Sequence, residues 1–109
     1  MSSPPEEFRF LVDELGFREH RAALHDGALE VDWKHPTAGT ALHVVVGPAG
    51  ATEGWFGRLD RRGRLRPLDR DTIDRDWVLL APPEPLEQCA RDVRSFGRKL
   101  LQPEVFFGG

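Results

Sequence analysis

Short apolar segments separated by turn residues fill the chain from residue 18 to residue 81, and this pattern constrains the fold most. Asp26-Gly27 stands between two of these segments and is a residue pair that two-residue hairpin turns prefer. Directly after it, residues 28–34 alternate apolar and polar side chains, as in a strand with one buried face. The pattern predicts a meandering antiparallel sheet.

The turn signals divide this stretch into five or six strands. Residues 40–46 form a nearly continuous apolar run, which indicates a central strand covered on both faces or nearly so. Pro67 marks its segment as an edge strand, and Pro82, Pro83 and Pro85 should break the chain after the last strand. We expect strands at residues 22–25, 28–34, 40–46, 54–59 and 64–68, and a sixth at 77–81.

Helical periodicity appears at both ends of the chain. Ser3 and Glu6 enclose two prolines in a sequence typical of a capping box, and apolar side chains with helical spacing follow as far as Leu15. This spacing predicts a first helix over residues 4–15, and residues 86–101 keep it for four further turns. Pro103 should end the second helix and leave 105–107 as a tail against the sheet, while Gly108-Gly109 is interpreted as a frayed end.

Together these elements predict a single α+β domain over residues 1–109. An N-terminal helix, an antiparallel β-meander of about five to six strands and a C-terminal helix would form two layers, with both helices packed on one sheet face. The other face would then be open to solvent or to a partner. It would carry polar side chains such as Glu30, Asp32, Lys34 and Arg58.

Composition limits the environment of the protein. No apolar run approaches the roughly 18 residues that a membrane span requires, and the first residues lack the basic and apolar regions of a secretory signal. A single cysteine, Cys89, rules out an internal disulfide and lies on the apolar stripe of the second helix, where it should pack as a small hydrophobe. We therefore expect a cytoplasmic protein without a membrane partner.

The residues capable of acid–base or metal chemistry show no recognised spacing. The histidines at positions 20, 25, 35 and 43 include no pair at a metal-ligand interval, and Asp26 beside His25 is already explained by its turn. The aspartates at 69, 71, 74 and 76 lack the spacing of a calcium loop and alternate with arginine. We expect no catalytic residue, no cofactor and no metal site, and hence a protein that is not an enzyme. A site assembled from His25, Asp26 and distant residues is the enzyme alternative.

Arginines gather in the middle of the chain. Residues 58–76 contain seven Arg and five Asp, whereas the whole chain has a net charge of -3. Arg and Trp are enriched at protein-interface hot spots, and the same composition serves nucleic-acid surfaces, although dedicated nucleic-acid binders are usually basic overall. We expect a protein partner, with a nucleic-acid-associated module using the Arg-rich hairpin at 58–66 as the alternative. The candidate partner-binding residues are Trp55, Arg58, Arg61, Arg62, Arg64 and Arg66.

Two further segments carry a resemblance. The opening Phe8-Arg9-Phe10-Leu11-Val12-Asp13-Glu14-Leu15-Gly16-Phe17 and the later Leu100-Leu101-Gln102-Pro103-Glu104 resemble a loose group of small bacterial α+β proteins of unknown function. In that group a short helix ending in Gly-Phe precedes a β-meander and a final helix. Some of its members resemble immunity proteins of toxin systems. The resemblance implies an immunity-like interaction protein of bacterial origin and brings no catalytic residues.

Overall fold

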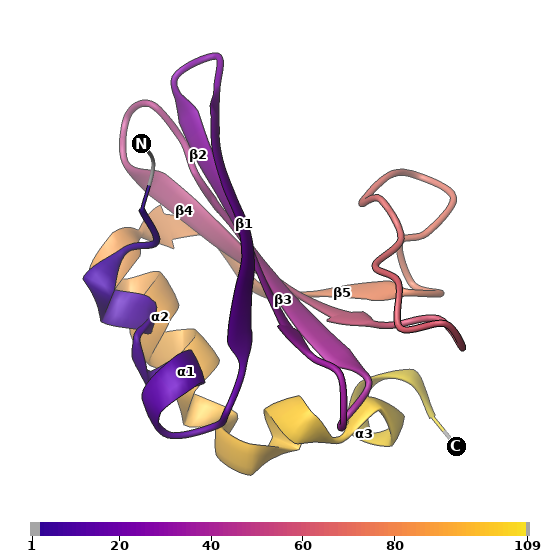
Figure 1. Ribbon diagram of the computed structural model, residues 1–109. Helices are drawn as coiled ribbons and strands as arrows, with labels where there is room; N and C mark the ends of the chain where they lie inside the picture. The colour runs from indigo at the N-terminus through magenta and orange to yellow at the C-terminus, as the bar shows by residue number, and fades with distance from the viewer. Residues whose placement is uncertain (1–2, 109) are drawn as a thin grey trace.

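The computed structural model describes residues 3–108, and within them the chain is an α+β fold with one antiparallel sheet (Figure 1). The strands follow one another in spatial order β1-β2-β3-β4-β5, so the predicted meander is confirmed. Their bounds are β1 (Arg18–His25), β2 (Ala28–His35), β3 (Thr40–Val46), β4 (Ala51–Arg58) and β5 (Trp77–Pro85). The helical segments are η1 (Glu6–Phe8), α1 (Phe10–Asp13), α2 (Leu86–Ser95), η2 (Gly97–Leu101) and α3 (Pro103–Phe107).

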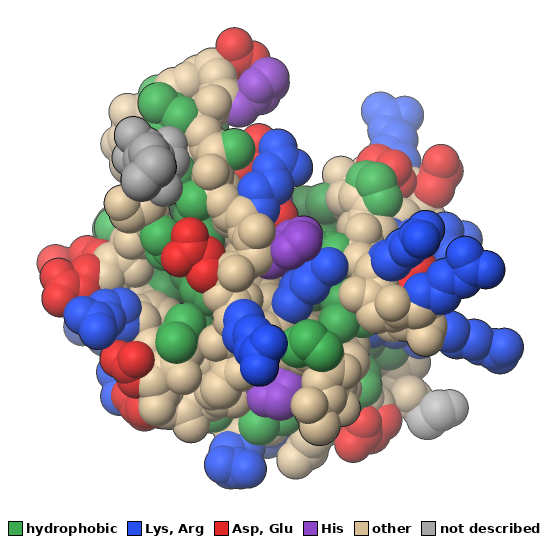
Figure 2. Space-filling view, in the orientation of Figure 1, with side chains coloured by type: hydrophobic (Ala, Val, Ile, Leu, Met, Phe, Trp, Pro, Cys, Tyr) green, Lys and Arg blue, Asp and Glu red, His purple; other side chains and the backbone are tan. Residues whose placement is uncertain are grey.

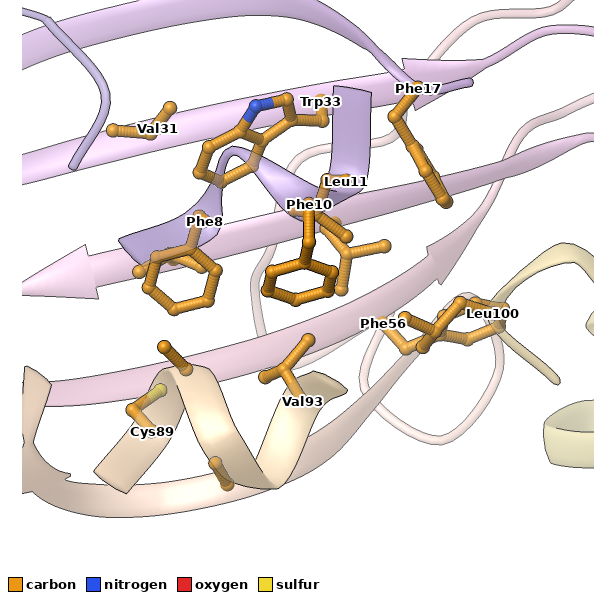
Figure 3. Close-up of a cluster of buried hydrophobic side chains, with 14 residues drawn as sticks. Phe8, Phe10, Leu11, Phe17, Val31, Trp33, Phe56, Cys89, Val93 and Leu100 are labelled. Carbon is orange, nitrogen blue, oxygen red and sulfur yellow. The ribbon is translucent and has the colours of Figure 1, made fainter. Parts of the chain in front are cut away.

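One face of the sheet forms the floor of the hydrophobic core. Val31 lies opposite Val44, and Trp33 lies opposite Leu42, which in turn lies opposite Phe56. All five residues are at most 1% exposed, and residues of the helical segments pack with them (Figure 3). The period-2 alternation of the strands thus gives the sheet a dry side.

The opposite side, which we call the open face, carries a row of side chains that crosses all five strands. Arg21, Asp32, His43, Trp55 and Leu79 lie directly opposite one another in successive strands. In Figure 1 the loop 59–76, between β4 and β5, lies on the other side of the sheet from α1 and α2. This loop therefore flanks the open face.

The hairpin at Asp26-Gly27 has the predicted turn conformation. Both residues have positive φ, 50° for Asp26 and 80° for Gly27, as a type I′ turn requires. Gly16, with φ 77°, likewise has the left-handed conformation expected where the first helical segment ends.

The prediction of one continuous helix over residues 4–15 was wrong. The segment consists of the short 3₁₀-helix η1 followed by the four-residue α1, and Pro5 rather than Ser3 caps η1 without a side-chain hydrogen bond. Phe8 and Leu11 are nevertheless fully buried, as the apolar periodicity predicted, whereas Val12, which belongs to the same predicted stripe, is 44% exposed. Tertiary packing, rather than capping, holds this segment.

The C-terminal half also differs from the prediction. The α-helix α2 ends at Ser95, and Gly97, with φ 54°, begins the 3₁₀-helix η2. Pro103 begins a new helix, α3, in place of the predicted tail, because proline fits the first turn of a helix. Phe106 of α3 packs on Phe56 with ring centroids 4.2 Å apart.

The strand predicted at 77–81 is present but longer than predicted, and the strand predicted at 64–68 is absent. Strand β5 continues through Pro82, Pro83 and Pro85, because as an edge strand it can leave amide positions unpaired on its outer side. Segment 64–68, in contrast, forms no strand and contributes only an isolated bridge between Leu65 and Leu59. No helix within residues 3–108 is long and apolar enough to cross a membrane.

Candidate functional site

A groove of about 560 Å³ lies on the open face. Strand β1 lines one side of it with His20 and Arg21, and the loop 59–76 lines the other with residues 65–68. Side chains of β2, β3, β4 and β5 line the remainder: Glu30, Asp32, His43, Val45, Glu53 and Trp77. The volume is within the range of ligand-binding clefts, and the surface of the groove is about equally polar and apolar.

A buried histidine–aspartate pair lies in this groove. His43 and Asp32 are opposite residues of β3 and β2, each is 9% exposed, and the Asp32 carboxylate is hydrogen-bonded to Nδ1 of the imidazole. The other ring nitrogen, Nε2, lies 3.5 Å from a carboxylate oxygen of Glu30. Burying the Asp32 carboxylate would be costly without a partner, and His43 supplies one. The expectation that Asp32 is open to solvent was therefore wrong.

Trp77 holds the loop against the sheet. Its indole ring covers Gly57, where an added Cβ would meet ring atoms at 2.8 Å, so the packing requires glycine. The indole N–H donates a 3.0 Å hydrogen bond to the carbonyl of Arg66, and the ring lies edge-on to His43 at 5.8 Å between centroids. Because Trp77 is 1% exposed, this contact fixes the loop wall of the groove at a buried point.

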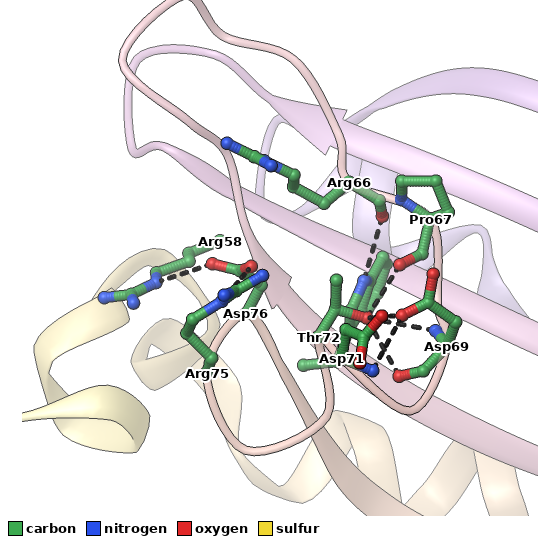
Figure 4. A network of polar contacts seen from close by, with 9 residues as sticks. Arg58, Arg66, Pro67, Asp69, Asp71, Thr72, Arg75 and Asp76 are labelled. Carbon is green, nitrogen blue, oxygen red and sulfur yellow. Dashed lines mark hydrogen bonds and ion pairs between the residues drawn. The ribbon is translucent and has the colours of Figure 1, made fainter.

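A second set of contacts organises the rest of the loop (Figure 4). The Thr72 hydroxyl donates to the Pro67 carbonyl at 2.7 Å and accepts from the Asp69 amide at 3.0 Å. The carboxylate of Asp69 accepts the amide of Asp71 at 2.9 Å. These aspartates cap turns, and among residues 3–108 no three His, Cys, Asp or Glu side chains are grouped as a metal site would require.

Four arginines of the loop have no acidic partner among the described residues, unlike Arg75, which pairs with Asp76. Within the described part of the chain, no ion pair involves Arg61, Arg62, Arg64 or Arg66, or Arg21 across the groove. Figure 2 shows basic side chains gathered on the loop. The neighbouring Asp60 carboxylate accepts the backbone amides of Arg64 and Arg62, and hydrogen bonding, mainly from Arg64, lowers its pKa below the ordinary value. Asp60 therefore shapes the turn.

The structure separates Arg58 from the other candidate residues. Arg58 lies opposite Thr40, on the core side of the sheet, where it pairs with Asp76 at 3.2 Å and lies 5.1 Å from the ring centroid of Phe107. Strand alternation explains this, since Arg58 shares the side of Phe56. The prediction that Arg58 belongs to the exposed face was wrong. Trp55, by contrast, is half-buried on the open face beside His43.

The remaining chemical candidates do not form sites. His25 and Asp26 are 3.3 Å apart at the hairpin tip, with side chains 74% and 91% exposed. Cys89 is fully buried, and burial together with the nearby carboxylates of Glu84, Asp92 and Glu53 raises the pKa of its thiol to about 12. A thiol that stays protonated and inaccessible is a poor nucleophile.

The His43–Asp32 pair was missed by the sequence reasoning, which treated His43 singly and Asp32 as a surface residue. A signal existed. A loop of residues 36–39 joins two strands, and the buried side chains of these strands, such as Trp33 and Leu42, must lie on the same face of the sheet. The register that pairs these two residues also places position 43 opposite position 32.

Comparison with protein-family models, with curated proteins and with solved structures found no match. The function has to be inferred from the groove itself.

Proposed function

We propose that this domain binds another protein, and that an acidic or mixed-charge segment of that partner lies on the open face between the loop 59–76 and β1. The observation that carries the proposal is that Arg21 and Arg66 line opposite sides of one groove without an ion pair among residues 3–108, while Arg62 and Arg64 line an adjoining hollow. Arginine and tryptophan are enriched at interface hot spots, and the half-buried Trp55 lies on the same face of the sheet.

The rigidity of the loop wall supports a binding role. Trp77 and Thr72 fix the loop through partly buried hydrogen bonds, so little conformational entropy would be lost when a partner docks.

The edges of the sheet support docking on the face rather than addition of a strand. Strand β1 has a register shift between Glu19 and Arg21, and β5 carries three prolines. Bulges and prolines are devices that prevent edge-to-edge pairing.

Charge favours a protein over nucleic acid. The chain has a net charge of -3, and the carboxylates of Glu30 and Glu53 also line the groove, where they would repel a continuous phosphate backbone. An immunity-like role in the bacterial cytoplasm, without catalysis by this chain, is the form of this function that the resemblance implies.

A photo-crosslinking amino acid placed in the groove tests the proposal. Leu68→benzoylphenylalanine should give a nuclease-resistant adduct with one protein in cells of the source organism, whereas the same residue at Arg98, in η2, should not. The purified partner should then bind the triple variant R61A/R62A/R64A about tenfold more weakly, and should bind the matched triple variant R91A/R98A/K99A, on the helical side, as it binds the wild type. Adducts with nucleic acid alone, or no adduct specific to position 68, would overturn the proposal.

A further inference from the structure

Arg21 occupies a position where a cross-strand ion pair is expected and is not formed. It lies directly opposite Asp32 on the same face of the β1–β2 pair. Side chains at such positions have Cβ atoms about 5 Å apart, and oppositely charged ones commonly interact. The carboxylate of Asp32 is instead hydrogen-bonded to His43, its neighbour on the other side. Two basic residues therefore compete for one carboxylate, and His43 holds it.

The consequence is a free guanidinium in the groove. Asp32 is 9% exposed and already bonded, and Glu30, the next carboxylate along β2, lies 3.5 Å from the same imidazole. With both acidic side chains of β2 turned toward His43, Arg21 has no ion pair among residues 3–108 although it lines a groove that contains three carboxylates.

Arg66 supplies a second guanidinium from the opposite side. Its carbonyl accepts the Trp77 indole N–H, so its backbone is fixed at the groove, and its side chain has no ion pair in the described chain. Arginine pairs on facing walls are suited to a carboxylate, because planar guanidinium groups donate paired hydrogen bonds to its two oxygens.

We propose that Arg21 and Arg66 form the subsite for a single Asp or Glu side chain of the protein partner, and that His43 keeps this subsite open by holding Asp32. The inference deepens the proposed function and rests on it. His43 is a positioning residue here, since it acts on the ligand only through Asp32 and Arg21. Glu53, which also lines the groove, limits the subsite to an isolated carboxylate rather than a run of phosphates.

The test uses a fluorescein-labelled hexapeptide with a single glutamate, Gly-Ser-Glu-Ser-Gly-Ser, as the probe, with fluorescence anisotropy measured at low salt on the full chain. Arg21→Ala and Arg66→Ala should each weaken binding about fivefold. His43→Leu should weaken it as much as Arg21→Ala does, although it removes no group that touches the probe, because Asp32 is then free to capture Arg21. The double variant D32N/H43L should restore binding to within about twofold of the wild type, since the amide that replaces the carboxylate carries no charge to compete.

If His43 had only a structural role, the additional substitution D32N would not restore peptide binding. Restored binding in D32N/H43L therefore distinguishes the positioning role of His43 from a structural one. Circular dichroism of each variant confirms that the folded protein is compared, and D32N/H43L, which leaves no buried unpaired charge, keeps the test usable where His43→Leu alone does not fold.

Three outcomes would overturn the inference. The subsite would be refuted if the Arg21→Ala variant bound the peptide as tightly as the wild type. It would also be refuted if D32N/H43L bound the peptide as weakly as Arg21→Ala does. Tighter binding of a single-stranded DNA decamer than of the single-glutamate peptide would remove the carboxylate assignment. If crosslinking at position 68 and the loop variants still support a protein partner, the proposed function stands and only this subsite fails.

Discussion

The carboxylate of Asp32, in β2, is hydrogen-bonded to the imidazole of His43 in the neighbouring strand β3. It forms no ion pair with Arg21, which lies opposite it in the other neighbouring strand, β1. The hydrogen bond to His43 gives the buried carboxylate of Asp32 a partner and leaves the guanidinium group of Arg21 available at the groove. The buried carboxylate of Asp32 is therefore satisfied within the chain, whereas the guanidinium groups of Arg21 and Arg66 at the sides of the groove form no ion pair among the described residues, as expected of a binding surface.

The His43–Asp32 pair should matter for stability. His43→Ala removes the buried partner of the Asp32 carboxylate and leaves only the exposed Arg21 to pair with it, and we expect the free energy of unfolding to fall by about 1–3 kcal/mol. Urea denaturation followed by circular dichroism measures it. The control is His25→Ala, whose pair with Asp26 is exposed and should change stability by less than about 0.5 kcal/mol. Equal effects of the two substitutions would show that the buried pair contributes nothing.

The indole N–H of Trp77 should determine how firmly the loop is held. Trp77→Phe removes the hydrogen bond to the Arg66 carbonyl and should cost about 1–2 kcal/mol while exposing the loop arginines to trypsin. Cleavage between residues 61 and 70 under native conditions should accelerate severalfold. Trp55→Phe is the matched control, because the buried N–H of Trp55 has no hydrogen-bond partner among the described residues. Faster cleavage in Trp55→Phe than in Trp77→Phe would contradict the assignment.

The carboxyl groups of Glu84 and Asp92 should make stability depend on pH. Hydrogen bonding to Asp92, burial and repulsion by Asp92 raise the pKa of Glu84 above its ordinary value of 4.5. The folded chain thus binds this proton more tightly than the unfolded chain does. The stability that this group contributes is complete below the ordinary value and is lost as the pH rises through the raised pKa.

Glu84→Gln, which can donate to Asp92 at every pH, should therefore be more stable than the wild type at pH 7. The difference should shrink as the pH falls toward 4, as urea denaturation over that range would measure. Glu87→Gln, at an exposed position of α2, is the control. A Glu84→Gln protein that is less stable than the wild type at pH 7 would refute the sign.

The thiol of Cys89 should be unreactive toward alkylating agents in the folded protein. Its thiol is fully buried and its pKa is raised to about 12, so both access and thiolate are lacking at pH 8. We expect iodoacetamide to modify the native protein no faster than the chain unfolds, and to modify it rapidly in urea, as intact-mass spectrometry would follow. Native modification at the rate of free glutathione would show that the thiol is accessible.

The sequence predicted the sheet well because its signals are local. Asp26-Gly27 specified a turn, and the alternation at 28–34 specified which side chains are buried, including Val31 and Trp33. The helix ends and β5 were predicted less well, because packing decides them. A proline such as Pro82 looks like a strand breaker in one dimension and is tolerated at the outer edge of a sheet in three.

The candidate site was predicted in part. Arg61, Arg62, Arg64 and Arg66 were selected by composition, and all four lie in the loop beside the groove. Composition could not separate Arg58 from them, since only the strand register assigns it to the other side of the sheet. Arg21 was missed by the sequence analysis. It is free because Asp32 pairs with His43 instead, and His43 and Arg21 become neighbours of Asp32 only when the strands have paired.

The central claim is that the open face, and not the helical side, receives an acidic partner segment. Titrating the isotope-labelled protein with the unlabelled single-glutamate peptide and following ¹H–¹⁵N correlation spectra tests it most directly. We predict that the largest shift changes occur at Arg21, His43 and the loop 59–76, with little change in α2. Changes that gather on α2, or that spread evenly over the whole chain, would contradict it.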